Sequence, residues 1–219
     1  ESNQIIDIIQ DNKGVMWFAT LGGGITSFDG INFKNYDLGV QDFSTIQIDM
    51  FDNIWFASNG GGFFMYDGVK FENYNIDDGI LSNNINLLVF DNANNLWIGS
   101  EKGINKIIFE LKDTLGHIKY IVNNVESYGV EDGLVGVETN QGSVLKDNEG
   151  NLWFGTVNGV SKYNPKADKF NIKSPKVKLK ELKLNNSTTN WSQYSDSILP
   201  WNHLPIDLLL KYNQNNLTF

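Results

Sequence analysis

Short apolar runs recur along most of the chain, and each is followed by a cluster of Asp, Asn and Gly residues. Four of these clusters share one pattern, in which Asp is followed by Trp at the sixth position and by Gly at the twelfth. The four sets are Asp11, Trp17 and Gly23; Asp49, Trp55 and Gly61; Asp91, Trp97 and Gly103; and Asp147, Trp153 and Gly159. Equal spacing in four copies predicts a repeat protein.

Each copy contains the strands of a small antiparallel sheet. In the first copy, apolar runs at Ile5–Ile9 and Val15–Ala19 flank the Asp cluster, which predicts a β-hairpin. Two further strands are predicted at Ile25–Phe28 and Asn32–Tyr36, joined by the Asp29-Gly30 turn. The four Trp residues are expected on second strands and largely buried. Aromatics at a shared register in the first two copies are also expected in the core; they are Phe28, Phe33, Tyr36, Tyr66, Phe71 and Tyr74.

The repeated Asp is best interpreted as a turn former. The third residue after it is always Gly, Asn or Asp, the types that best tolerate a left-handed backbone; these are Gly14, Asp52, Asn94 and Gly150. An Asp carboxylate accepts hydrogen bonds from backbone N–H groups two residues on. We therefore favour a structural role for this Asp over a metal-binding or catalytic one.

The third copy departs from the repeat. The distances between successive Trp residues are 38, 42 and 56 residues, and the last is lengthened by an excursion over Glu110–Asn123. A longer connection in one repeat is a place where a ligand or partner contact is often added, although drift explains it equally well.

Four-stranded units of about 40 residues with a Trp signature are typical of β-propellers. The predicted fold is therefore all-β, with propeller blades near residues 3–36, 43–74, 84–128 and 142–172. We expect the four blades to be part of a larger propeller, because the sequence begins directly inside a blade and stops inside the next domain. Their exposed faces would then be covered by another copy, by the tail or by neighbouring molecules.

The most regular copy, Asp147 to Thr156, reads Asp-Asn-Glu-Gly-Asn-Leu-Trp-Phe-Gly-Thr, and the first two copies add Asp-Gly downstream. This pattern resembles the two-component regulator propeller repeat, over roughly residues 3–172. The third copy lacks Asp-Gly, and the fourth has Asn164-Pro165 instead. The resemblance implies an extracytoplasmic sensor region of a bacterial histidine kinase or hybrid two-component system.

The segment 173–219 looks different from the repeats. It is read as a Lys-rich linker followed by two stretches, Val177–Leu184 and Leu208–Phe219, that resemble the opening strands of a triple-tyrosine (Y_Y_Y) domain. In the family this domain is an immunoglobulin-like sandwich that follows the propeller and precedes the membrane span. A sandwich needs about seven strands, so only its beginning is expected here.

Charge and composition exclude several classes of partner. The net charge is −9, the chain has no cysteine, and all of its 17 basic residues are lysines. An acidic body without arginine argues against nucleic-acid binding. His117 and His203 share no ligand motif, so no metal and no cofactor are expected. No apolar stretch approaches the roughly 20 residues of a membrane span. Contact with a membrane is therefore expected only through segments outside this sequence.

Candidate ligand-binding residues come from the positions that break the repeat. The loops after the second strands and those between blades are expected at one edge of the propeller, opposite the Asp hairpins. The candidates there are Glu101, Lys102, Glu131, Asp132, Glu138, Asn140 and Asn158. Their acidic and amide groups suit sugar hydroxyls, and the alternative is that these are merely tight polar turns. No catalytic residue is predicted, because no carboxylate pair or nucleophile motif has an informative spacing.

Three functions remain open. The first is a non-enzymatic sensor on the periplasmic or extracellular side of the membrane, which binds a small molecule or oligosaccharide. The resemblance also implies that the full-length protein is a histidine kinase and forms a homodimer. The second is a propeller-fold carbohydrate-active enzyme, and the third is a protein-binding scaffold. The triple-tyrosine resemblance favours the first.

Overall fold

A computed structural model describes residues 4–114, 117–167, 179–199, 203–214 and 216–219. The chain forms two compact units, Glu1–Asp168 and Lys169–Phe219. The expected fourth strand of the fourth blade, with Phe170, and the start of the stretch at Val177 lie outside the described residues.

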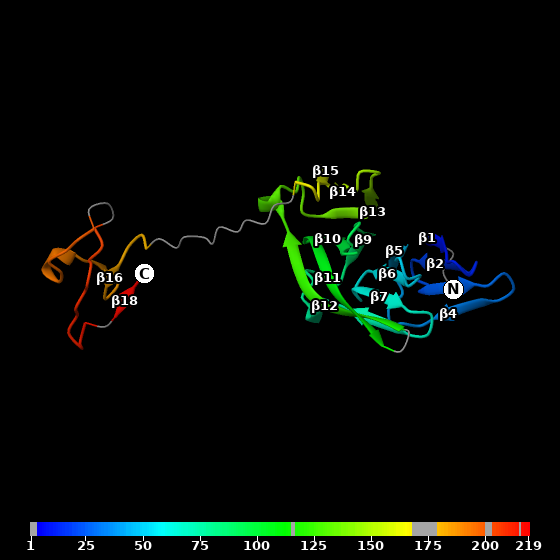
Figure 1. The fold of residues 1–219 in the computed structure, drawn as a ribbon, viewed down its shortest axis with the longest axis horizontal. Coiled ribbons are helices and arrows are strands. Elements are labelled where there is room, and N and C mark those ends of the chain that lie inside the picture. The colour runs from blue at the N-terminus through cyan, green and yellow to red at the C-terminus, as the bar shows by residue number, and fades with distance from the viewer. Residues whose placement is uncertain (1–3, 115–116, 168–178, 200–202, 215) are drawn as a thin grey trace. The chain divides into compact units, whose positions relative to one another are not determined.

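The first unit consists of antiparallel sheets that each follow the chain order (Figure 1). The first blade contains β1 (Ile5–Gln10), β2 (Met16–Thr20), β3 (Ile25–Phe28) and β4 (Phe33–Tyr36). The second contains β5 (Phe43–Ile48), β6 (Ile54–Ser58), β7 (Phe63–Tyr66) and β8 (Phe71–Tyr74). The third contains β9 (Ile85–Phe90), β10 (Leu96–Ser100), β11 (Gly103–Thr114) and β12 (His117–Tyr128). The described part of the fourth contains β13 (Thr139–Lys146), β14 (Leu152–Thr156) and β15 (Gly159–Tyr163). The all-β propeller prediction is confirmed.

The Asp clusters form the predicted hairpins. In the second blade, Asp49 Oδ1 accepts hydrogen bonds from the backbone N–H groups of Phe51 and Asn53, at 2.8 and 3.0 Å. Asp49 Oδ2 accepts the indole N–H of Trp55 at 2.9 Å. The same carboxylate–indole bond recurs in the other three blades. The third residue after each Asp has a positive φ, as expected for this turn. The structural role of the repeated Asp is thus explained by geometry.

The hydrophobic core lies between blades, because Trp17, Trp55 and Trp97 each pack on the blade that follows. Trp17 contacts Phe56 and Tyr66 of the second blade, with ring centroids 5.8 and 5.2 Å apart. Trp55 contacts Phe90 and Tyr120 of the third blade at 5.4 and 5.0 Å. The rings of these three interfaces form separate buried clusters.

Two of the expected core residues are exposed, and this corrects the sequence-based expectation; four others, Phe28, Tyr36, Tyr66 and Phe71, are half-buried. Trp153, on the second strand of the fourth blade, is 36% exposed, and Phe33 of the first blade is 69% exposed. In the described part of the chain, Trp153 has no following blade to pack on, and Phe33 has no preceding one. Leu145 and Val160 are exposed on the same face as Trp153, and Ile8 on the same face as Phe33. Shared register therefore predicts burial only where the blade that the side chain faces is present, as for Trp17, which is 3% exposed against the second blade.

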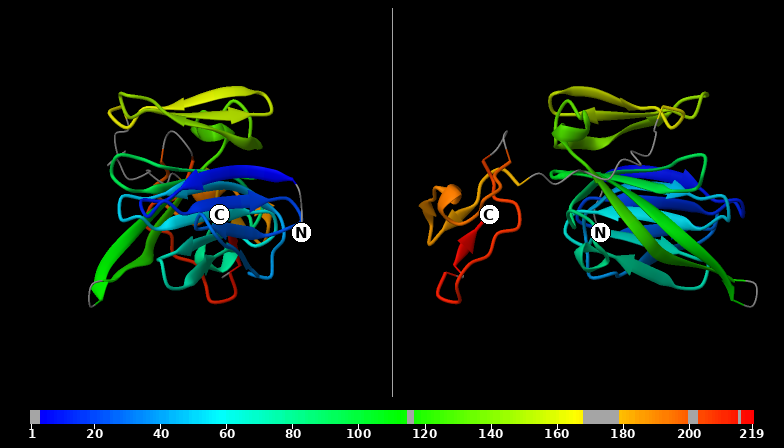
Figure 2. Two further views of the ribbon diagram at one scale, coloured as in Figure 1. Left: turned by 90° about the vertical axis from the view of Figure 1, so that its right-hand side faces the viewer. Right: turned by 60° about the vertical axis from the view of Figure 1, so that its left-hand side comes forward.

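The excursion in the third blade is a regular extension of the β11–β12 hairpin. In both views of Figure 2 this long green hairpin extends beyond the other strands of the unit. Its residue Tyr120 packs against Trp55 and donates its hydroxyl to Asp49 Oδ2 at 2.6 Å. Burial, and then the Asp49 carboxylate, raise the pKa of Tyr120 above its ordinary value. The excursion therefore contributes to the core between the second and third blades.

The second unit is a small sheet around one apolar cluster. Its strands are β16 (Lys183–Leu184), β17 (Ser187–Thr188) and β18 (Leu217–Thr218), in the order β17-β16-β18. Trp191, in the short 3-10 helix Trp191–Gln193, is buried and donates its indole N–H to the Leu182 carbonyl at 3.1 Å. The pairing of β16 with β18 joins the two stretches expected to form opening strands. Their immunoglobulin-like assignment stays a prediction. Within the described residues, no helix is long and apolar enough to cross a membrane.

Candidate functional site

The loops after the second strands and the connections between blades meet at one edge of the propeller, which we call the turn edge. The backbone N–H of Gly22 donates to Asp42 Oδ1 at 2.7 Å. Further along, the N–H of Val157 donates to the Glu138 carbonyl at 3.0 Å. The Asp hairpins lie at the other end of the strands, which we call the hairpin edge. The expected separation of these two edges follows from the antiparallel order of the strands.

Glu101 and Lys102 form the turn between β10 and β11. Glu101 Oε1 accepts a hydrogen bond from the Ser82 hydroxyl at 2.7 Å. Glu101 Oε2 is buried and has no hydrogen-bond partner among the described residues. Lys102 is exposed, and its backbone N–H donates to Ser100 Oγ at 3.1 Å. This turn offers an acceptor and a cation close together.

Glu131 and Asp132 lie in a short 3-10 helix, Val130–Asp132, at the connection to the fourth blade, and both are exposed. Asp132 Oδ2 accepts the backbone N–H of Gly129 at 2.8 Å. Asp78 makes the same bond with Asn75 at 2.9 Å in the preceding connection. Asp132 is therefore a second repeated turn former, a correspondence that the sequence reasoning missed.

Glu138, Asn140 and Asn158 are exposed residues at the same edge. The Asn140 amide donates to the Thr156 carbonyl at 3.1 Å. Thr139 donates its hydroxyl to the Ser100 carbonyl at 3.2 Å and so joins this loop to the turn of Glu101. The structure thus brings together the candidates of the third and fourth blades. The excursion is separate from them, because its Tyr120 reaches Asp49 at the hairpin edge.

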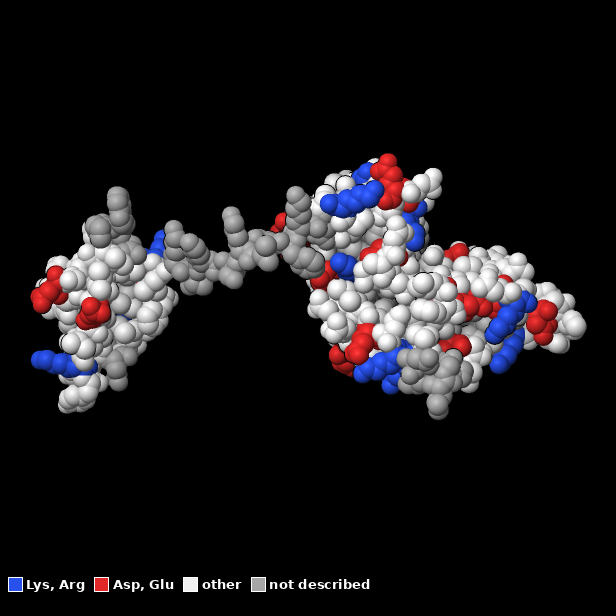
Figure 3. Space-filling view, in the orientation of Figure 1, with Lys and Arg blue, Asp and Glu red and all other residues white. Residues whose placement is uncertain are grey.

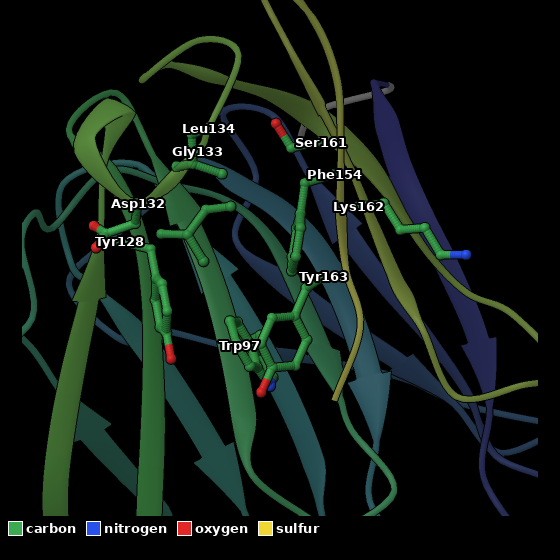
Figure 4. A pocket seen from close by; sticks show the side chains of 10 residues that line it. Trp97, Tyr128, Asp132, Gly133, Leu134, Phe154, Ser161, Lys162 and Tyr163 are labelled. Atoms are coloured by element: carbon green, nitrogen blue, oxygen red, sulfur yellow. The ribbon is translucent and has the colours of Figure 1, made fainter. Parts of the chain in front are cut away.

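Close to these candidates, a cavity of about 70 Å³ lies between the third and fourth blades. The rings of Trp97, Tyr128 and Tyr163 surround its lower part, and Asp132 lies above them (Figure 4). Lys162 points away from this aromatic group (Figure 4). Of the predicted ligand-binding residues, Asp132 lines this cavity. Its volume is well below the range of about 300–1,000 Å³ typical of small-molecule sites.

A larger hollow of about 330 Å³ lies between the first and second blades at the hairpin edge. We call it the hairpin-edge cleft. Its wall includes the rings of Trp17, Tyr36 and Tyr66, and its polar groups come from Asp11, Lys13, Asp29, Asn32, Lys34 and Asp52. Lysine and acidic side chains lie side by side on the right of the first unit in Figure 3, where Figure 1 places the first blade. The sequence reasoning missed this cleft because its polar residues were assigned to turns or, for Asn32 and Lys34, to a predicted strand.

A third hollow, of about 420 Å³, lies where the innermost strands of the first, second and fourth blades approach one another. Asp7 stands at its side, and its Oδ2 accepts hydrogen bonds from Thr45 Oγ1 at 2.9 Å and the Ile46 N–H at 2.8 Å. The Gln141 amide donates to the Ser44 carbonyl across it at 3.4 Å. These polar groups already bond one another. Within the described residues, no group of three His, Cys, Asp or Glu side chains is placed to hold a metal ion.

Comparison with known families identifies the repeats. This fold and its repeated Asp–indole bond define a β-propeller built from hairpin repeats. The two-component regulator propeller family matches residues 1–22, 79–102 and 136–158, which contain the first two strands of the first, third and fourth blades. These segments are two-component regulator propeller repeats, as the sequence resemblance indicated.

Relatives of known name are much longer than this chain. Histidine kinase P4 of Formosa agariphila is 27% identical over 113 residues, which is 51% of this chain and 7% of the relative. The extracellular domain of a putative hybrid two-component system from B. thetaiotaomicron is 27% identical, with a TM-score of 0.59. The match covers 75% of this chain and 24% of that one.

Two further solved structures share the fold. Another putative hybrid two-component system from B. thetaiotaomicron has an extracellular domain that aligns with a TM-score of 0.62 at 22% identity, over 75% of this chain and 22% of that one. A virginiamycin B lyase from Staphylococcus aureus aligns with a TM-score of 0.52 at 13% identity, over 76% of this chain and 59% of that one. At these identities the likeness shows the fold alone.

Proposed function

We propose that this chain is part of the extracytoplasmic sensor region of a two-component histidine kinase or hybrid system. The observation that carries the proposal is the 27% identity, at a TM-score of 0.59, to an extracellular domain of a putative hybrid two-component system. The match to a histidine kinase and the propeller repeats support the same class. The chain then lies on the periplasmic or extracellular side of the cytoplasmic membrane and works within a homodimeric full-length receptor.

The sensor acts by binding, and its ligand is a small molecule or a carbohydrate. Carboxylate, amide and ammonium groups suit ligand hydroxyls, and the turn edge carries them on the exposed residues Lys102, Glu138, Asn140 and Asn158 and on the partly buried Glu101. The repeated Asp residues are used by the hairpins, since each accepts backbone and indole N–H groups. Binding without turnover is the function that this use of carboxylates supports best.

The test is a glycan-array and thermal-shift screen on the intact extracytoplasmic region, with an assay for cleavage products in the same samples. The sensor proposal expects saturable binding and unchanged ligand. Glu131→Ala and Asn140→Ala report whether the turn edge takes part. Turnover that a single carboxylate substitution abolishes would instead establish the enzyme alternative, and binding to a protein partner alone would establish the scaffold.

A further inference from the structure

The hairpin edge contains the same site twice, once filled and once open. Between the second and third blades, Tyr120 fills the space beside Trp55, with ring centroids 5.0 Å apart. Its hydroxyl donates to Asp49 Oδ2 at 2.6 Å. This bond is short, as expected for an O–H donor and a carboxylate. The chain therefore shows which group this position accepts: a six-membered ring that carries a hydroxyl.

Between the first and second blades, the corresponding space is the hairpin-edge cleft of about 330 Å³. Its Asp11 and Trp17 occupy the repeat positions of Asp49 and Trp55, with the same carboxylate–indole bond, here at 3.0 Å. The second blade has a short turn between β7 and β8, whereas the third has the long hairpin that carries Tyr120. The second blade thus sends no long hairpin into this position.

Two residue differences between the first and second blades enlarge the cleft and change the hydrogen bonding of Asp11. Met65 is paired with Trp55 across the second blade, whereas the small Ser27 is paired with Trp17 in the first. Asp49 Oδ2 also accepts the side-chain amide of Asn53 at 2.9 Å. The residue at that position of the first blade is Val15, which has no side-chain donor. Among the described residues, Asp11 Oδ2 accepts the indole N–H of Trp17, and a carboxylate oxygen can accept a further hydrogen bond.

The rim of the cleft determines the class of ligand. Asp29, Asn32 and Lys34 add carboxylate, amide and ammonium groups around the rings of Tyr36 and Tyr66. A phenol has one hydroxyl and would use only one of these groups, whereas a sugar ring presents several hydroxyls. The lining contains both aspartates and lysines, which favours a neutral ligand over a strongly charged one. A volume of about 330 Å³ lies at the lower end of the range for small-molecule sites, roughly 300–1,000 Å³.

We propose that the hairpin-edge cleft binds a neutral pyranose ring of a carbohydrate. One sugar hydroxyl donates to Asp11 Oδ2, as Tyr120 does to Asp49, and the rim groups bond the others. The proposal rests on the proposed sensor function and names a site for it that is distinct from the turn edge.

The experiment is isothermal titration of the 219-residue chain with four methyl pyranosides. The probes are methyl β-D-glucopyranoside, methyl β-D-galactopyranoside, methyl α-D-mannopyranoside and methyl β-D-xylopyranoside, with N-acetyltyrosinamide as the phenol. Ser27→Met copies the second blade's residue and fills the cleft, so pyranoside affinity is expected to fall at least tenfold. Asn32→Ala removes a rim amide and is expected to weaken binding several-fold. Lys70→Ala, at the corresponding exposed position of the second blade, is the matched control and leaves binding unchanged.

The outcomes separate this site from the sensor function. Pyranoside binding that survives both Ser27→Met and Asn32→Ala would overturn the site and leave the sensor function standing. Binding of the phenol alone would overturn the carbohydrate class. Absence of binding by all five probes would overturn the cleft proposal, while the glycan screen on the intact region tests the sensor function separately. Should Ser27→Met fail to fold, the comparison of Asn32→Ala with Lys70→Ala decides.

Discussion

The repeat Trp is buried to different extents in different blades, so replacing it by Ala is predicted to lower stability by different amounts. Trp55 is 0% exposed and lies between the second and third blades, whereas Trp153 is 36% exposed. Both donate their indole N–H to the repeated Asp at 2.9 Å. Replacement by Ala therefore removes the same hydrogen bond from both blades, and the difference reports packing alone.

The expected loss of unfolding free energy follows from the burial of each Trp. Trp55 contacts the rings of Phe63, Tyr74, Phe90 and Tyr120, with centroids between 5.0 and 6.0 Å away. A large-to-small change at such a site costs roughly 3–5 kcal/mol. None of the blades that the structure describes faces Trp153, so Trp153→Ala is expected to cost about 1–2 kcal/mol, including the lost hydrogen bond.

The assay is urea unfolding of both variants, followed by far-ultraviolet circular dichroism because the substitutions alter fluorescence. We expect Trp55→Ala to be less stable than Trp153→Ala by about 2–3 kcal/mol, from the two estimates above. Equal losses, or a loss below about 1 kcal/mol for Trp55→Ala, would refute the packing of one blade's Trp on the next.

Three further predictions concern individual contacts. Tyr120→Phe removes the hydroxyl that Asp49 accepts and should cost about 2 kcal/mol in urea unfolding. Because the pKa of Tyr120 is raised in the folded protein, the stability that its hydroxyl contributes is present below about pH 10 and is lost as the pH rises through the folded pKa. The wild-type chain should therefore lose more stability in alkali than Tyr120→Phe, and equal alkaline losses would contradict this. Gly62→Ala should lower the free energy of unfolding by about 2–3 kcal/mol, because φ is +78° and the added Cβ meets a backbone carbonyl. Gly30→Ala, where the added Cβ meets open space, should lower it by about 1 kcal/mol. Equal shifts in melting temperature would refute the clash at Gly62. Asp147 accepts hydrogen bonds first from an indole and then from an amide, so NMR titration should give a pKa below the ordinary value of about 3.9, and an ordinary value would show that these bonds are not held in solution.

Local chemistry made the hairpins predictable from sequence. The Asp, the turn residue and the Trp of each copy form bonds within seven residues of chain, so their spacing alone fixed the geometry. Burial could not be predicted in the same way, because it depends on the adjacent blade. Trp97 and Trp153 have the same sequence context, yet the first is buried against Phe154 and the second is partly exposed.

The candidate sites were only partly predictable for a similar reason. The grouping of Glu101 with Asn140 at the turn edge followed from strand order, and the Thr139–Ser100 contact is consistent with it. The hairpin-edge cleft depends on Tyr120 filling one interface and on no equivalent residue filling the next. No pattern within a single copy reveals this difference, which appears only when two interfaces are compared in three dimensions.

The most direct test of the account is a nitrogen–proton NMR titration of the chain with the four methyl pyranosides, observing the tryptophan indole N–H signals. If the cleft binds a pyranose, the Trp17 signal shows a saturable shift, because its N–H donates to Asp11. The Trp55 signal stays unchanged, because Tyr120 already fills the space beside it. The sugar resonances in the same tube should show no product. Shifts confined to Trp97, or sugar turnover, would contradict the account.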